Sequence, residues 1–216
     1  DNTPEVRGTI NEVTVPLRVR NIQSYQFYGF NAINRLELEN TVLKILPAAF
    51  KNCTSLSSLT LKPNLWFIGS GAFANSGLNE LTIPSTVTTM EQGVCRGANK
   101  LTRVVIPNSI ESILEYSFYG CDKLNDVVIE PAVEPTLGKK AKGLKYIADY
   151  AFGSNELTEI TIPASVKTIG RNAFANCPNL RVINIAEYPK SHVSDLSSDS
   201  IDNAPWGAPN ARVNYL

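Results

Sequence analysis

The sequence has little of what most catalytic sites are built from. Its 216 residues include a single histidine, His192, and four cysteines, and no two cysteines are spaced as Cys-x-x-Cys or set with histidine as in a zinc site. Because zinc and many redox sites use such spacings, we predict no metal and no other cofactor. A phosphate-binding loop of the Walker type is also absent, which excludes the enzymes that depend on one.

The chain also lacks net charge and long hydrophobic runs. It has 20 lysines and arginines against 20 aspartates and glutamates, so it lacks the electrostatic footprint of a protein that binds nucleic acid or a membrane surface. No apolar run approaches the roughly 18 residues that span a bilayer, and the start DNTPEVRGTI has neither the basic nor the apolar region of a signal peptide. We therefore predict no nucleic-acid partner and no membrane span, in a chain that is either cytosolic or secreted and already trimmed.

What the sequence does contain is an internal repeat. Residues 41–61 read TVLKILPAAFKNCTSLSSLTL and residues 165–185 read SVKTIGRNAFANCPNLRVINI, with Ala-Phe, Asn-Cys and closing apolar residues in the same order. The steps between successive Ala-Phe positions are 22 or 23 residues, except for one of 34, and this period lies within the range of leucine-rich repeats. The aligned positions are Phe27, Phe50, Phe73, Cys95, Phe118, Phe152 and Phe174.

Each repeat closes with apolar and polar residues in alternation, which predicts a strand with one buried face. The seven predicted strands are centred on Leu36-x-Leu38, Leu59-x-Leu61, Leu81-x-Ile83, Val104-x-Ile106, Val127-x-Ile129, Ile160-x-Ile162 and Ile183-x-Ile185. A proline follows three of them directly, and the chain must turn there because proline has no N–H for a ladder. A second apolar segment then comes, as at 87–90, 110–113 and 166–169, and predicts a strand or extended wall on the opposite side.

The aligned phenylalanines predict a spine of one ring per coil inside the stack. Fully burying each ring stabilises the fold by roughly 1.5 to 3 kcal/mol, and because a lone repeat cannot bury its own face, stability is a sum over neighbouring repeats. Cys95 replaces the ring in the fourth coil. We expect a thinner core there, and a bend or a looser stack.

These repeats resemble the BspA-type leucine-rich repeats of bacterial proteins, whose unit reads roughly I-G-x-x-A-F-x-x-C-x-x-L-x-x-L-x-I-P-x-S-V. The stretch IGRNAFANCPNLRVINI, residues 169–185, matches that unit almost position for position, and the likeness covers residues 22–186. The resemblance implies a mainly β repeat solenoid, a right-handed coil of about seven repeats of 22–23 residues with a parallel β-sheet on one face. It implies no particular activity, because such repeats are scaffolds.

The domain organisation follows from where the repeat begins, breaks and ends. We predict one domain, residues 1–216, with an N-terminal cap at 1–21, repeats at 22–186 and a C-terminal cap at 187–216, because the ends of a repeat array must be covered. Trp206 is a candidate plug for the last coil. The long step after Phe118 predicts an insertion near 134–145, and insertions in solenoids form loops on one face.

The cysteines and the histidine are the remaining candidates for chemistry. Cys53, Cys121 and Cys177 share one repeat position, and coils about 4.8 Å apart would hold the nearest two on the order of 10–15 Å apart, beyond the roughly 7 Å limit for a disulfide. We predict buried, reduced thiols. His192 lies in PKSHVSD, where Ser, His and Asp are close in sequence, but catalytic triads are assembled from distant segments, and a surface histidine is the alternative that we favour.

Reading the outward strand positions across the repeats gives two columns on the sheet. The first contains Glu80, Arg103, Asp126 and Glu159, and the second contains Thr82, Val105 and Val128. The charged column predicts either a ladder of cross-strand ion pairs, each stabilising by a few tenths of a kcal/mol, or a ligand site. Its carboxylates lie on an open sheet rather than in the cleft that glycoside hydrolysis needs, so we predict that the chain is not an enzyme.

Two further features could form a binding surface. The insertion contains Lys139, Lys140, Lys142 and Lys145 against Glu134, a local charge of +3, which suits an acidic partner or simply keeps a loop solvated. Tyr25, Tyr116 and Tyr150 each lie two residues before the aligned position, where they would either project from one edge or shield the coils.

The resemblance carries the functional hypothesis, because BspA-like proteins are bacterial surface proteins that bind host matrix proteins such as fibronectin and fibrinogen and mediate aggregation. It implies a non-enzymatic, extracellular or surface-attached adhesion module for a host protein or glycan. The candidate ligand-binding residues are Arg103, Asp126, Glu80, Glu159, Thr82, Val105, Val128, Lys139, Lys140 and Lys142. The alternatives are a structural subunit that binds a partner of the same cell envelope, and an enzyme that uses the C-terminal cap.

Overall fold

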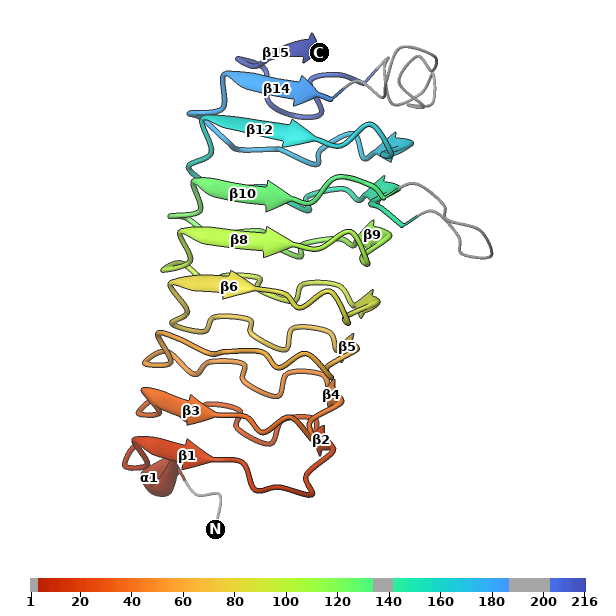
Figure 1. The fold of residues 1–216 in the computed structure, drawn as a ribbon. Coiled ribbons are helices and arrows are strands. Elements are labelled where there is room, and N and C mark those ends of the chain that lie inside the picture. The colour runs from red at the N-terminus through yellow and green to blue at the C-terminus, as the bar shows by residue number, and fades with distance from the viewer. Residues whose placement is uncertain (1–3, 134–141, 187–202) are drawn as a thin grey trace.

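The protein is a stack of coils, most of which have a strand of the main sheet on one side and a shorter strand on the other (Figure 1). The computed structural model describes residues 4–133, 142–186 and 203–216. The solenoid predicted from the repeat is confirmed: the architecture is mainly β, with parallel strands and about seven turns. The one described helix, α1 (Pro4–Arg7), is a single turn at the N-terminal end, and no helix in the described ranges is long and apolar enough to cross a membrane.

The main sheet carries its strands in chain order along the stack. They are β1 (Glu12–Thr14), β3 (Arg35–Glu37), β6 (Glu80–Thr82), β8 (Arg103–Ile106), β10 (Asp126–Ile129), β12 (Glu159–Ile162), β14 (Val182–Ile185) and β15 (Arg212–Tyr215). All pairs are parallel and in register, so that Glu80, Arg103 and Asp126 lie side by side. We call the outward-facing side of these strands the long-strand face.

Hydrogen bonds divide this sheet into three ladders, namely β1–β3, β6–β8–β10 and β12–β14–β15. One prediction is wrong in part: residues 58–61, around Leu59-x-Leu61, are not a strand. Their side chains still alternate as predicted, with Leu59 and Leu61 buried and Ser58 and Thr60 exposed. The alternation sets which side chain points inward but does not decide whether the backbone pairs, since β6 has the same alternation and a single β-branched residue, as residues 58–61 do, and is a strand.

The opposite side of the coils has short two-residue strands, as the second apolar segment of each repeat predicted. One sheet contains β2 (Asn21–Ile22), β4 (Lys44–Ile45), β5 (Phe67–Ile68) and β7 (Thr89–Met90), and the other contains β9 (Ser112–Ile113), β11 (Tyr146–Ile147) and β13 (Thr168–Ile169). Each pair is parallel and aligns the same position of successive repeats. The two walls therefore share one repeat register.

The phenylalanine spine lies between the walls and is interrupted once. Phe50 stacks on Phe27 with ring centroids 5.3 Å apart and on Phe73 at 5.7 Å, with the planes 3° from parallel in both cases. The stack resumes from Phe118 through Phe152 to Phe174, with centroids 5.3 and 5.8 Å apart. Cys95 lies fully buried at the interruption, so the fourth coil has a thiol where its neighbours have a ring.

A sharp turn follows each spine position and explains the residue types found there. The second residue after the spine has a positive φ in all seven coils; these residues are Gly29, Asn52, Asn75, Gly97, Gly120, Ser154 and Asn176. Glycine adopts this left-handed conformation without strain, and asparagine is the commonest other residue in it. This turn explains why Gly or Asn so often occupies the position two residues after the spine, directly before the Cys of the repeat in three coils.

The sheet continues into both segments that we predicted to be caps. In the N-terminal segment β1 pairs with β3, and in the C-terminal segment β15 pairs with β14. Trp206 is fully buried in the core, and its carbonyl accepts a hydrogen bond from the Phe174 N–H at 3.0 Å. The last coil is thus covered by a chain segment outside the repeats. Most of the predicted insertion, 134–141, and residues 187–202 lie outside the described residues.

Candidate functional site

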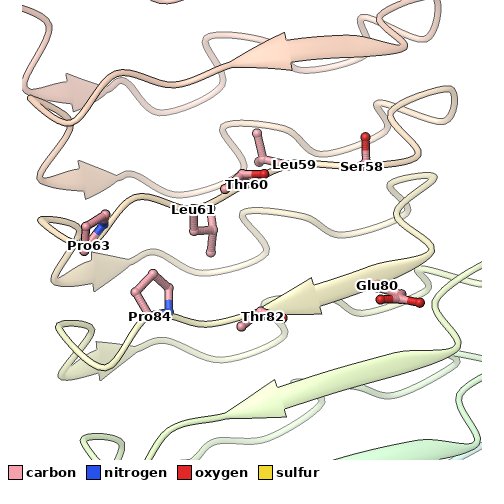
Figure 2. A pocket seen from close by; sticks show the side chains of 8 residues that line it. All are labelled: Ser58, Leu59, Thr60, Leu61, Pro63, Glu80, Thr82 and Pro84. Carbon is pink, nitrogen blue, oxygen red and sulfur yellow. The ribbon is translucent and has the colours of Figure 1, made fainter.

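A pocket of about 370 Å³ opens on the long-strand face where the ladder is interrupted. Residues 58–61 and 63 line one side, and Glu80, Thr82 and Pro84 line the other (Figure 2). Leu59 and Leu61 form its apolar floor and are 8% and 7% exposed. Polar side chains from Ser58, Thr60, Glu80 and Thr82 surround this floor, so the pocket has an apolar centre and a polar rim.

The backbone around this pocket is unusual for a solenoid. Within the described parts of the chain, the N–H and C=O groups of residues 58–61 make no hydrogen bond to either neighbouring coil. Just before this stretch, the Asn79 N–H donates a hydrogen bond to the Ser57 carbonyl at 3.0 Å. Residues 58–61 lie within the stack, between the coils that carry β3 and β6, and not at a free sheet edge.

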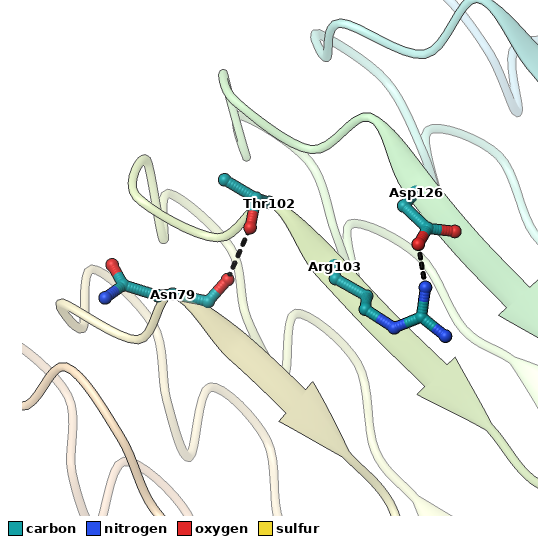
Figure 3. Close-up of polar contacts among 4 residues, drawn as sticks. All are labelled: Asn79, Thr102, Arg103 and Asp126. Carbon is teal, nitrogen blue, oxygen red and sulfur yellow. Dashed lines mark hydrogen bonds and ion pairs between the residues drawn. The ribbon is translucent and has the colours of Figure 1, made fainter.

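The charged column beside the pocket has one ion pair, and among the described residues neither Glu80 nor Glu159 pairs with a cation. Arg103 donates a hydrogen bond to Asp126 in the next strand, and both side chains are about two-fifths exposed (Figure 3). Glu80 lies opposite Arg103 in the register, but no ion pair to Glu80 occurs in the described ranges. Glu80 therefore leaves a negative charge at the rim of the pocket.

Hydrogen bonds next to this column fix the strands that carry it. The Thr102 hydroxyl donates to the Asn79 carbonyl at 3.0 Å, which ties the start of β8 to the start of β6 (Figure 3). Further along the stack Glu159 accepts a hydrogen bond from Asn184, which in turn accepts one from Asn214 at 2.9 Å. Glu159 is thus engaged in a polar chain, whereas Glu80 is not.

The structure brings some of the predicted site residues together and separates others. Glu80, Arg103 and Asp126 share one ladder, and so do Thr82, Val105 and Val128, whereas Glu159 belongs to the next ladder. Lys142 is exposed, and its carbonyl accepts a hydrogen bond from the Val133 N–H at 3.0 Å, while Lys139 and Lys140 lie outside the described residues. The leucines and prolines of the pocket were not among the predicted site residues.

The tyrosines before the spine form a separate surface on the flank. Tyr25, Tyr116 and Tyr150 have positive φ values of 58° to 59°, at the position that Gly71 and Gly93 occupy in other coils. Tyr116 stacks on Tyr150 with centroids 5.5 Å apart, and the Arg96 guanidinium lies 5.2 Å from the Tyr116 ring. Tyr25 projects and is 60% exposed, whereas Tyr116 and Tyr150 cover one another.

The groups considered for catalysis are buried or outside the described ranges. All four cysteines are free and buried, as predicted. Burial raises the pKa of Cys53 and Cys121 to about 12 and that of Cys177 to about 11, and it also raises the pKa of Cys95. Since the thiolate is the nucleophile and metal ligand, these thiols are inert. His192 lies outside the described residues, and the described ones contain no cluster of His, Cys, Asp or Glu that could hold a metal.

Comparisons with known proteins agree with this architecture. A leucine-rich repeat protein of Bacteroides ovatus is 22% identical with a TM-score of 0.53, and the match covers 96% of this chain and 61% of that protein. A leucine-rich repeat protein of T. pallidum is 18% identical with a TM-score of 0.57, and the match covers 95% of this chain and 74% of that protein. The comparison with curated proteins finds no match.

The family is given by the repeat itself. The model of the BspA type leucine rich repeat region matches residues 7–98 and 88–203, with six copies of the repeat. Together these matches span most of the 216 residues, and they include the pocket and the strands β6, β8, β10 and β12 that carry the charged column. The chain belongs to the BspA-type leucine-rich repeat family.

Proposed function

We propose that this chain is a non-enzymatic binding module of the bacterial cell surface and that it binds an extracellular protein, such as a host matrix protein, on the long-strand face. The observation that carries the proposal is the pocket at residues 58–61, where an apolar floor, free backbone groups and an uncompensated carboxylate meet. Interfaces combine a buried apolar centre with a polar rim in this way. The membership of the BspA-type family supports the protein-binding role and the surface location.

The buried thiols support a binding module rather than an enzyme. The four cysteine thiols are buried in the core, where burial raises their pKa values. The scaffold therefore presents a surface and keeps its thiols away from it. A tight complex with a protein of the same cell envelope is the alternative use of the same surface.

The test is a binding array of immobilised matrix proteins and glycans, probed with the purified chain over a salt series. Thr82→Arg places a long charged side chain over the pocket and should abolish binding, whereas Thr161→Arg changes the same column in another ladder and should leave binding intact. Both threonines are exposed, so neither change disturbs the core.

Each other outcome points elsewhere. Equal loss in both threonine variants would contradict the pocket as the site. Loss only in a Lys139/Lys140/Lys142→Ala variant, with strong salt sensitivity, would place binding on the insertion and favour an acidic partner. Binding to glycans alone would contradict the protein ligand, and silence across the array would favour the envelope partner.

A further inference from the structure

The pocket at residues 58–61 combines three features that together define the chemistry of its ligand. Its floor is formed by two leucines, and Pro63 and Pro84 stand on opposite sides of it (Figure 2). Neither proline has an N–H group, so this part of the wall is apolar even in its backbone. A bulky aliphatic side chain that enters the pocket is therefore removed from water on several sides.

The rim adds a requirement for positive charge. Glu80 is the one ionisable residue among the eight that line the pocket. The nearest cation in the column, Arg103, is engaged with Asp126 on its far side, and Ser58, on the other side of Glu80, is uncharged. A ligand that brings a Lys or Arg side chain to Glu80 supplies the missing partner.

The backbone adds a requirement for amide groups. The N–H and C=O groups of residues 58–61 are unpaired within the described chain, and Ser58 and Thr60 are exposed beside them. A ligand that reaches these groups from the long-strand face with an amide N–H or C=O supplies a hydrogen bond to them. A carbohydrate is a poorer fit, because the lining contains no aromatic ring face and no side-chain amide, and a nucleic acid would be repelled by Glu80.

We propose that this pocket binds an extended segment of a protein partner in which a bulky aliphatic side chain lies next to a lysine or arginine. The inference rests on the proposed function, which it narrows from a protein surface to one peptide chemistry. Leu59 and Leu61 receive the aliphatic group, Glu80 pairs with the cation, and the backbone of residues 58–61 binds the peptide amides.

The proposal can be tested with synthetic peptides and the ¹⁵N-labelled chain in NMR titrations. The probe is a pentapeptide, acetyl-Ser-Leu-Arg-Leu-Ser-amide, and its matched controls replace the arginine by glutamine or both leucines by alanine. The expected result is a saturable shift of the amides of residues 58–61 and 80–82. The leucine-free peptide should bind at least about tenfold more weakly, and the arginine-free peptide about two- to fivefold more weakly, as for an exposed ion pair.

Variants of the chain separate the charge from the fold. Glu80→Gln should remove the preference for arginine, and Ser58→Lys should remove it too by giving Glu80 an internal partner. Glu159→Gln is the matched control, because Glu159 belongs to the same column but accepts a hydrogen bond from Asn184, and it should keep the preference. Ser58 and Glu80 are both exposed, so all three variants are expected to fold.

Three outcomes would overturn the proposal: shifts that map outside the pocket, an arginine preference that survives in Glu80→Gln, or no shift with any peptide at millimolar concentration. Isopentylamine serves as a further control, and if it bound as tightly as the peptide the occupant would be a small amphiphilic amine. The array experiment distinguishes this failure from that of the proposed function. Binding there that Thr82→Arg abolishes, without peptide binding here, would retain the long-strand face as the site and reject only the peptide chemistry.

Discussion

The four buried thiols should make this protein less stable at alkaline pH. The ordinary thiol pKa of 9.0 is raised by burial to about 12 for Cys53 and Cys121 and to about 11 for Cys177. The folded chain thus keeps protons that the unfolded chain releases. Once the pH exceeds about 9, the unfolded chain releases these protons and is stabilised relative to the folded chain. The stability is therefore fully present below about pH 9 and is lost as the pH rises through the folded pKa values.

The magnitude follows from the separation of the pKa values. At about pH 10 an exposed thiol is mostly ionised while the buried one is not, and the difference lowers the free energy of unfolding by about 1.4 kcal/mol for each thiol. Cys53, Cys121 and Cys177 together account for about 4 kcal/mol on this basis. Cys95, whose pKa is raised by burial and by the neighbouring Cys121, adds to the same loss. For a domain of ordinary stability this is a large fraction of the total.

The assay is urea unfolding followed by circular dichroism at about pH 8 and about pH 10, with a reductant present, on the wild type and Cys121→Ala. Lysines and tyrosines also titrate in this range, but they are common to both proteins and cancel in the comparison. The variant starts from a lower stability, yet its loss between the two pH values should be smaller by about 1.4 kcal/mol. Equal losses in the two proteins would refute the reasoning, and so would rapid labelling of the native thiols by a thiol reagent at about pH 8.

Three further predictions concern the coils. Gly93→Ala should lower the free energy of unfolding by about 1 to 2 kcal/mol, because φ is positive there. Gly97→Ala should lower it by about 1 kcal/mol more, since the new Cβ would meet the Asn75 side chain and break its hydrogen bond to Asn52 in the preceding coil. Equal losses for the two variants in urea unfolding would contradict this. Phe73→Ala should cost about 3 to 5 kcal/mol, and a cost under about 1 kcal/mol in the same assay would contradict the spine as a packed core. Amides of residues 58–61 should exchange with deuterium faster than those of β8, and NMR-detected protection equal to that of β8 would show that the ladder is intact there.

The fold could be predicted well from the sequence because the same pattern of apolar positions recurs in every repeat. Seven aligned positions fixed the period, and each one then had to occupy the same place in the coil. The burial of the spine and the free thiols followed from that alignment, since Cys53 and Cys121 could not approach each other in any stack with this spacing. The turn after the spine could also have been predicted, because Gly or Asn occupies this repeat position in every coil except the one with Ser154.

The site was harder to predict because it arises where the repeat fails to produce its usual hydrogen bonds. Leu59-x-Leu61 has the same alternation as Leu81-x-Ile83, yet only the second is a strand, and alternation carries no information on interstrand bonds. The repeat alignment predicted that Arg103 lies between Glu80 and Asp126. It did not predict which of the two carboxylates pairs with Arg103, because that depends on side-chain geometry. Lys139 and Lys140 remain predictions, because they lie outside the described residues.

The interrupted ladder is tolerable in this fold because side-chain burial and backbone pairing are separable in a solenoid. Leu59 and Leu61 remain in the common core, and the same coil is held on the opposite wall by β5, which pairs with both β4 and β7. A coil can therefore release its backbone groups on the long-strand face and stay in register through its core and its other wall. In a two-stranded or isolated sheet the same loss would unpair the strand. A repeat array thus offers places where hydrogen-bonding capacity can be left open to a ligand, and in this chain one such opening lies beside Glu80, a carboxylate with no ion pair and no side-chain hydrogen bond among the described residues.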